Sequence, residues 1–283
     1  MEKKSSIQSL PFLLVSLTGV AVFILIPFVD VVRRSFFSSM GGDFVGLKNY
    51  QEVLKNSAFQ LAAKNTLKFV GICLPLLLIL SMGLALLIRS LGQKNAFFKT
   101  SFLLPLAIPT SSVVLLWNLF FAPKGILNGW LFSLFDRSPE DWLNSRYAFS
   151  ILVFTYLWKN VGYNMILFLA AFSTIPKNLY EAAAIDRSGP IRTFFSITLP
   201  NILPSLYAIL LLSFVNIFKV FREVYLLAGE YPDQRIYMLQ HLFNNWFRDL
   251  AMDRLAAGAV ITALFVGVLI FFLQLLKRGV RHI

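Results

Sequence analysis

Long apolar segments, separated by short charged ones, are the feature that most restricts the fold of this chain. Six such segments run approximately over residues 10–32, 66–89, 101–122, 148–172, 201–221 and 254–276. A helix rises 1.5 Å per residue, so about 20 apolar residues cross the hydrocarbon layer of a bilayer. The pattern therefore predicts six membrane crossings.

Composition agrees with a membrane location. Apolar residues make up 57% of the 283 residues and charged residues only 14%, whereas a soluble domain carries about 25% charged residues. The apolar segments do not alternate as barrel strands do, and backbone amides in lipid need partners within their own segment. We expect an all-α integral membrane protein in which residues 1–283 form one transmembrane domain.

The charged residues favour a lipid partner over nucleic acid. Lys and Arg total 26 against 14 acidic residues, a net charge of +12, but they lie between the apolar segments, where they face anionic lipid headgroups.

The single cysteine, Cys73, falls within the second segment and has no disulfide partner. His241 and His282 are far apart in the sequence and have no neighbouring ligands, so no metal site is expected.

Six crossings place both termini on the same side. If both are inside, the inner segments are 1–9, 90–100, 173–200 and 277–283. The raw count of Lys and Arg does not favour this orientation, but their density and the net charge do.

The N-terminal apolar run is too long for a secretion signal and lacks a cleavage site of small residues, so we interpret it as a retained first span.

The inner segment 173–200 has the pattern of two short helices on a membrane surface. Asn178 is a candidate helix cap, with Glu181 three residues later to bond back to it. Alanines 182–184 favour helix, and Ser188-Gly189-Pro190 should end it. Residues 191–198 then repeat apolar side chains at helical spacing. From physics alone, this hairpin is either an interfacial anchor or a docking element for a partner protein.

Several motifs resemble one transporter family. Glu181-Ala182-Ala183, followed at fixed distances by Ile197, Leu199 and Pro200, resembles the signature loop of binding-protein-dependent ABC importer permeases. Residues 44–50 (FVGLKNY), 158–164 (WKNVGYN) and 213–227 resemble the sugar-permease branch, which includes the maltose and glycerol-3-phosphate permeases.

The resemblance implies a permease subunit of an ATP-driven, binding-protein-dependent carbohydrate importer in the cytoplasmic (inner) membrane, with both termini cytoplasmic. The implied partners are a second permease subunit, usually a different chain, two cytoplasmic ATPase subunits and an extracytoplasmic substrate-binding protein. ATP and Mg²⁺ would be bound by the ATPase subunits, and this chain would need no cofactor of its own.

The same resemblance implies that the helix of the 173–200 loop couples the spans to the ATPase. The residues expected to make this contact are Glu181, Ala182, Ala183, Ala184, Asp186, Arg187 and Gly189. The family usually has glycine at the position of Arg187, where it supplies a left-handed backbone. Either Gly189 takes that role in a longer helix, or Arg187 itself adopts the unfavourable backbone.

The sequence shows no motif for ATP binding or catalysis by this chain. The sequence has no G-x-x-x-x-G-K-[ST] phosphate-binding loop, no paired catalytic carboxylates and no catalytic triad. We therefore expect a transport subunit that is not an enzyme, with its ATPase on a separate chain.

Polar side chains within the fourth and fifth segments are candidates for a substrate site, because polar groups in spans usually face a cavity or a partner. Aromatic rings beside amides suit a sugar. From the sequence and the resemblance, the candidates are Tyr156, Lys159, Asn160, Tyr163, Ser213, Asn216, Ile217 and Val220. Equally, these groups could bond neighbouring helices. Lys159, Lys219 and Arg222 suggest an anionic sugar, or they extend to the membrane surface.

Two further patterns give expectations. Pro75, Pro105, Pro109 and Pro204 lie within spans and should kink them. Met238, Leu242 and Trp246 form a stripe that either lies on the membrane surface or packs under a binding protein.

The main alternative function is a secondary transporter driven by an ion gradient. That class often shows inverted repeats and broken helices, and no internal repeat is evident here. An importer permease should co-purify with an ATPase, whereas an ion-driven carrier should work alone in vesicles.

Overall fold

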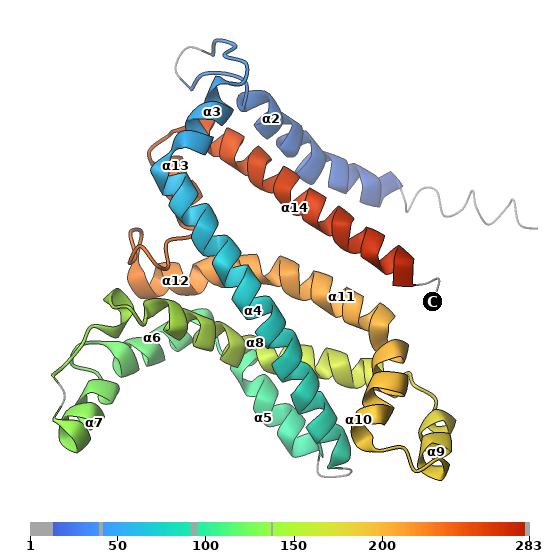
Figure 1. The fold of residues 1–283 in the computed structure, drawn as a ribbon. Helices are drawn as coiled ribbons and strands as arrows, with labels where there is room; N and C mark the ends of the chain where they lie inside the picture. Colours follow the sequence, from blue (N-terminus) through green and yellow to red (C-terminus); the bar gives the residue numbers. More distant parts are fainter. Residues whose placement is uncertain (1–13, 40–41, 92–94, 137, 281–283) are drawn as a thin grey trace, which may run out of the picture. The chain divides into compact units, whose positions relative to one another are not determined.

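The computed structural model describes residues 14–39, 42–91, 95–136 and 138–280 (Figure 1). The regular elements in this part of the chain are helices, with one isolated bridge between Phe37 and Phe44, which confirms the all-α prediction. Residues 1–13, including the start of the predicted first span, lie outside the described residues, as do residues 281–283. Two compact units form: residues 1–60 with 242–272, and residues 61–241 with 273–283. The prediction of one transmembrane domain stays a prediction.

Five helical stretches among the described residues are long and apolar enough to cross a membrane. They are Leu14–Arg34, Ser57–Ser90, Thr110–Phe135, Pro190–Ala228 and Met252–Leu275, and a shorter apolar helix covers Phe97–Ala107. Length and composition therefore confirm a multi-pass membrane protein.

The predicted fourth span is a long helix with a polar middle. Helix α8, Ala148–Ser173, has 26 residues, enough to cross about 30 Å of hydrocarbon. Lys159, Asn160 and Asn164 interrupt its apolar sequence, and α8 is not among the five stretches. The count of six spans stays a prediction.

The predicted third span, 101–122, is broken in the structure. Helix α5 (Asn95–Ala107) ends two residues before Pro109, and α6 (Thr110–Phe121) begins just after it. Pro109 has a ψ angle of 140° and precedes the new helix, and a residue before proline, here Ile108, is pushed away from helical backbone. Pro75, Pro105 and Pro204 lie inside continuous helices, and the kinks predicted there stay predictions.

The described part of the first unit begins with the helical stretch Leu14–Arg34, which includes the π-helical turn η1 (Ala21–Leu25) and α2 (Ile26–Arg34). A loop follows, closed by the buried Asn49 at the start of α3 (Lys48–Lys55). The Asn49 amide donates to the carbonyl oxygens of Ser35 and Phe37 at 3.0 and 2.9 Å. Gly46 has a φ of +58°, which glycine adopts without strain. The FVGLKNY motif therefore fixes this turn.

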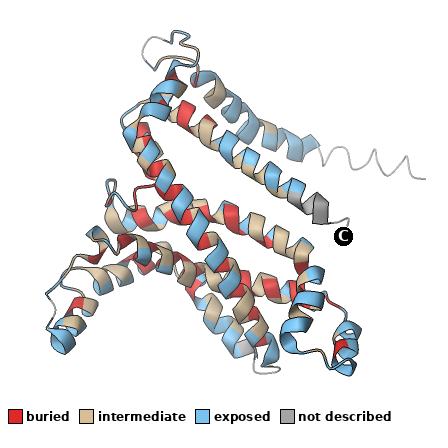
Figure 2. Ribbon diagram, in the orientation of Figure 1, coloured by how far each residue is buried: buried red, intermediate tan, exposed pale blue. Residues whose placement is uncertain are grey.

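The second unit contains most of α4 (Ser57–Ser90), α5, α6, α7 (Ile126–Phe135) and α8. After α8 come α9 (Lys177–Ile185), α10 (Pro190–Thr193), the π-helical turn η4 (Phe194–Thr198) and α11 (Leu199–Ile217). A 3₁₀ turn, Phe218–Val220, leads into α12 (Phe221–Ala228). Twelve residues of α8 are buried (Figure 2), so α8 forms the centre of this unit.

Two buried clusters hold the second unit together. The first contains Phe69 and Leu77 of α4, Tyr156 of α8, Ile217 at the end of α11 and Val220 of the 3₁₀ turn that follows it. The second cluster joins the other end of α4 to α8, α9 and α11. Buried apolar surface contributes about 25 cal/mol per Å² in water, but helices in lipid are held mainly by close packing.

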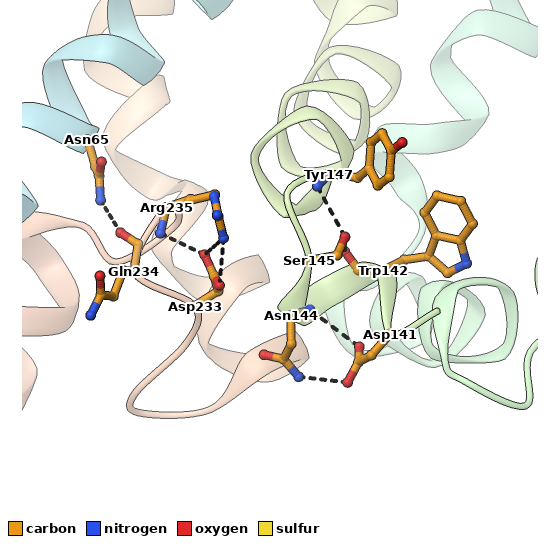
Figure 3. A network of polar contacts seen from close by, with 9 residues as sticks. All are labelled: Asn65, Asp141, Trp142, Asn144, Ser145, Tyr147, Asp233, Gln234 and Arg235. Atoms are coloured by element: carbon orange, nitrogen blue, oxygen red, sulfur yellow. Dashed lines mark hydrogen bonds and ion pairs between the residues drawn. The ribbon is translucent and has the colours of Figure 1, made fainter. Parts of the chain in front are cut away.

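Polar contacts fix two loops of the second unit (Figure 3). The amide of Asn65, on α4, donates to the carbonyl oxygen of Gln234 at 2.6 Å. Next to it, Arg235 forms an ion pair of 3.1 Å with Asp233. In the other loop, Asp141 accepts from the side-chain amide of Asn144 at 2.9 Å.

The stripe of Met238, Leu242 and Trp246 is buried. Their exposed fractions are 4%, 3% and 7%. Met238 joins the first cluster of the second unit, and Trp246 stacks on Phe59 with ring centres 6.4 Å apart. Both expectations for this stripe, lipid contact and contact with a binding protein, are therefore wrong, because side chains this buried reach neither.

Candidate functional site

The predicted coupling loop forms an exposed short helix, α9. Its residues Glu181, Ala182 and Ala184 are exposed, as are Asp186, Arg187 and Gly189 beyond its end (Figure 2). Ala183 is 8% exposed and packs inward. Six of the seven predicted coupling residues can therefore reach a partner, and Ala183 seats the helix on the protein.

The start of α9 differs from the expected capping box. Pro176 occupies the N-cap position and makes no side-chain cap bond, and the helix begins at Lys177. Asn178 lies inside the first turn, so the prediction that it caps the helix is wrong. Proline suits this boundary because its fixed φ and missing N–H leave no donor to satisfy.

Arg187 ends α9 in the left-handed conformation, with φ of +50°. The N–H of Ser188 bonds to the carbonyl oxygen of Ala183 at 2.9 Å, and the N–H of Arg187 to that of Ala184 at 3.1 Å. This pair of bonds is the Schellman ending that normally uses glycine. Gly189 has an ordinary φ of −66° as the cap of α10. Of the two alternatives, the second is confirmed: Arg187 itself takes the unfavourable backbone.

Three residues outside the predicted set hold α9 in place. The Tyr180 hydroxyl lies 3.0 Å from the Thr198 hydroxyl of η4. Arg89, near the end of α4, donates to the Tyr180 hydroxyl at 3.1 Å, and its guanidinium carbon lies 4.5 Å from the centre of the tyrosine ring. These contacts tie α9 to the end of α4 and to η4, which continues into α11. No sequence motif pointed to this triad, because its members are 91 and 18 residues apart.

The second short helix of the loop is continuous with the fifth span. Helix α10 passes through the π-helical turn η4 directly into α11. The break predicted at Ser188-Gly189-Pro190 is confirmed by the gap between α9 and α10. A π-helical turn is rare and often marks a functional position, and η4 lies where the loop joins the span.

The candidate substrate residues fall into separate groups. Tyr156, Ile217 and Val220 lie together in the first buried cluster. The Ser213 hydroxyl donates to the side-chain oxygen of Asn164 at 2.6 Å, which joins α11 to α8. The remaining candidates, Asn160, Tyr163 and Asn216, are half-buried, and the amide of Asn160 donates to the Tyr156 carbonyl oxygen of its own helix at 2.8 Å.

Lys159 forms a buried ion pair that sequence reasoning did not foresee. Its ammonium lies 2.7 Å from Oε1 of Glu223 on α12 and donates to the Thr110 hydroxyl on α6 at 2.8 Å. The exposed fractions of the Lys159 and Glu223 side chains are only 11% and 14%. The contact joins three helices and balances the lysine charge. Arg222 is exposed, and the side chain of Lys219 lies outside the described part of the structure.

Comparison with known proteins identifies the family. Residues 77–282 match the model of the binding-protein-dependent transport system inner membrane component. The chain belongs to this family. The match includes the predicted coupling loop and every candidate substrate residue. In this family the protein is a transport component of the membrane, as predicted.

Individual relatives agree over nearly their full length. The chain is 32% identical to the trehalose/maltose transport system permease protein MalF of Thermococcus litoralis, over 93% of this chain and 90% of that protein. It is 31% identical to the sn-glycerol-3-phosphate transport system permease protein UgpA of Yersinia pestis, over 96% of both chains. The sequence resemblance to the sugar-permease branch is thus confirmed.

Solved structures share the fold. A chain from the crystal structure of a bacterial ABC transporter involved in the import of the acidic polysaccharide alginate superposes with a TM-score of 0.85 and 22% identity. The match covers 98% of this chain and 96% of that one. The same score is found for the alginate ABC transporter in complex with an alginate pentasaccharide-bound periplasmic protein.

Proposed function

We propose that this chain is the permease subunit of an ATP-driven sugar importer and that α9 couples it to a separate ATPase. The family and the two transport permeases at 31–32% identity support the importer. The observation that carries the coupling role is the exposed end of α9, tied by Tyr180 to the ends of α4 and α11. A docking element needs both an exposed face and a firm connection to the moving parts.

In this mechanism ATP binding and hydrolysis occur on partner subunits, and this chain contributes no catalytic residue. Closure of an ATPase pair would push on α9, and the Tyr180 contacts would pass that displacement to α4 and α11. The bundle then changes between outward-open and inward-open states, with the equilibrium biased from a remote site. Glu181 and Asp186 offer carboxylates to the ATPase, and Ala182 and Ala184 allow close approach.

The proposed assembly contains a second permease subunit, two cytoplasmic ATPase subunits and an extracytoplasmic binding protein. The 173–200 loop then faces the cytoplasm, and both termini lie on the same side. The periplasmic protein bound to the alginate transporter supports the presence of a binding protein in this system as well.

The proposed substrate is an oligosaccharide. Relatives transport trehalose or maltose and glycerol 3-phosphate, and the structural neighbour imports alginate. The positive charge of Lys159 is balanced by Glu223, so it does not by itself favour an anionic sugar. Uptake assays with neutral and anionic oligosaccharides, each with the cognate binding protein, separate the two classes.

The coupling role is tested with Glu181→Lys in the assembled importer. We expect the variant to insert and fold normally, because Glu181 is exposed, but to lose substrate-stimulated ATP hydrolysis and uptake. Asp249→Lys is the matched control, since it makes the same charge change at another exposed position and should preserve both activities. If Glu181→Lys kept both, the coupling role would be wrong. If the chain alone took up substrate under an ion gradient, the proposed function would be wrong and the chain would be a secondary transporter.

A further inference from the structure

An apolar groove of about 600 Å³ lies beside the coupling loop. One wall is the end of α4, and the other is formed by α10 and η4, including Ile191, Phe194 and Phe195. Ile191 and Phe195 are 74% and 62% exposed. Both walls belong to stretches long and apolar enough to cross a membrane, Ser57–Ser90 and Pro190–Ala228, so the groove lies where two spans end.

The polar residues of the groove are few and include a cation. Arg89 lies one residue before the end of α4, with Tyr180 and Thr198 beside it. One guanidinium N–H group is used by the Tyr180 hydroxyl, which leaves the others of its five donors. Within the described part of the chain, Arg89 has no carboxylate in ion-pair contact. The tyrosine therefore orients a positive charge that no carboxylate among the described residues pairs with.

We propose that this groove binds an anionic phospholipid. Its acyl chain would lie along Leu86, Ile191 and Phe195, and its phosphate would accept hydrogen bonds from Arg89. A basic group between the ends of membrane helices is a recognised setting for anionic headgroups, and a planar guanidinium suits bidentate bonds to phosphate oxygens. The volume falls within the range of about 300–1,000 Å³ typical of ligand sites.

A bound lipid at this place would contact the moving part of the transporter. The groove shares Tyr180 and Thr198 with the contacts that hold α9, so lipid binding and the position of the coupling helix are linked. The proposal needs only the membrane location of the chain, and its failure would leave the result of the Glu181→Lys test unchanged.

The test measures lipid retained by the assembled importer in native mass spectrometry. Phosphatidylglycerol and phosphatidylcholine with identical acyl chains are added in turn. We expect the wild type to prefer phosphatidylglycerol and Arg89→Gln to lower that preference about fivefold, since one basic residue near a membrane surface contributes about 1 kcal/mol. Arg192→Gln is the control, because Arg192 belongs to α10 but does not line the groove.

Two further measurements test whether an acyl chain occupies the groove and whether the bound phosphate belongs to a lipid. Thr193→Trp, which narrows the groove, should lower retention of both lipids. Inorganic phosphate and glycerol phosphate should not compete, because they lack an acyl chain. An unchanged preference in Arg89→Gln would overturn the proposal. Efficient cross-linking of Phe195→Cys to another importer subunit would also overturn it. The native Cys73 is fully buried, so it does not compete with the new cysteine in this experiment.

Should Arg89→Gln fail to assemble, Thr193→Trp carries the test alone. This variant keeps the guanidinium and its tyrosine contact, so a loss of lipid retention then reports on the groove itself. Full retention of phosphatidylglycerol by Thr193→Trp would place the lipid elsewhere and refute the site.

Discussion

Gly162 of α8 lies directly against the carbonyl oxygen of Phe102 in α5. A Cβ atom added at Gly162 would overlap that oxygen and stand 2.5 Å from its carbon. Both atoms are backbone, so neither can rotate away as a side chain could. Helices in lipid gain their association largely from such close approach at small residues. The contact thus fixes how closely α5 packs on α8.

Gly162→Ala should separate α8 from α5. Overpacking typically costs 1–3 kcal/mol, and here the overlap is with backbone, so we expect a loss of about 3 kcal/mol and a lower melting temperature in detergent. The matched control is Gly83→Ala in α4, where an added Cβ meets nothing within 4 Å. That variant should melt at or slightly above the wild-type temperature, since alanine favours helix over glycine. Equal melting of the two variants would contradict the close contact.

For the Lys159–Glu223 pair, we expect removal of one charge to destabilise the protein more than removal of both. Lys159→Met should lower stability by about 3–5 kcal/mol, because it leaves a buried carboxylate without its partner. The double variant Lys159→Met/Glu223→Gln, which removes both charges, should regain most of this loss. Melting of the four proteins in the cycle gives the coupling energy.

An exposed pair provides the control for this cycle. Asp30 and Arg34 lie 2.6 Å apart with side chains 40% and 56% exposed. Exposed pairs contribute about 0–1 kcal/mol, so Arg34→Met should change stability little. If the buried and exposed pairs gave the same coupling energy, burial would not determine the contribution of Lys159.

The sequence predicted those features that depend on neighbouring residues. Long apolar segments indicate membrane helices because hydrocarbon thickness sets their length, and five such stretches are present. The loop break at Ser188-Gly189-Pro190 follows from local backbone preferences, as does the interruption at Pro109. The signature around Glu181 identified the family before any contact was known.

Contacts between distant residues could not be predicted in this way. Lys159 meets Glu223 64 residues later and Thr110 49 residues earlier, and its charge alone equally allowed a substrate or the membrane surface. The apolar stripe from Met238 to Trp246 has the same pattern whether it faces lipid or a protein interior. The capping prediction at Asn178 failed because Pro176 takes the N-cap position two residues earlier, which places Asn178 inside the first turn.

The left-handed backbone at Arg187 predicts a stabilising substitution. Left-handed helical backbone costs a residue with a Cβ atom about 1–2 kcal/mol, so Arg187→Gly should raise the stability of the loop by about 1 kcal/mol. Arg187→Ala removes the same side chain but keeps the Cβ atom, and it should show no such gain. Hydrogen exchange at the amides of Arg187 and Ser188, which close the Schellman bonds, measures the difference. Faster exchange in Arg187→Gly than in Arg187→Ala would contradict the strain.

His241, in the segment between the last two apolar stretches, predicts a pH dependence of stability. Its side chain is fully buried against the rings of Phe221 and Tyr237, its Nδ1 accepts from the Met238 N–H at 3.3 Å, and burial lowers its pKa to about 4. The folded protein therefore keeps His241 neutral where the unfolded chain, with a pKa near 6.5, takes up a proton.

The sign of this effect follows from proton uptake by the unfolded state. Above about pH 6.5 the histidine is neutral in both states and stability is unaffected. Below it the unfolded chain binds the extra proton, so stability falls, by about 2.5 kcal/mol at pH 4.5. His241→Gln keeps an acceptor for the Met238 N–H but cannot take up the proton, so its stability should not show this fall at low pH. Melting of both proteins between pH 7.5 and 4.5 tests it, and parallel pH profiles would show that His241 does not stay neutral in the fold.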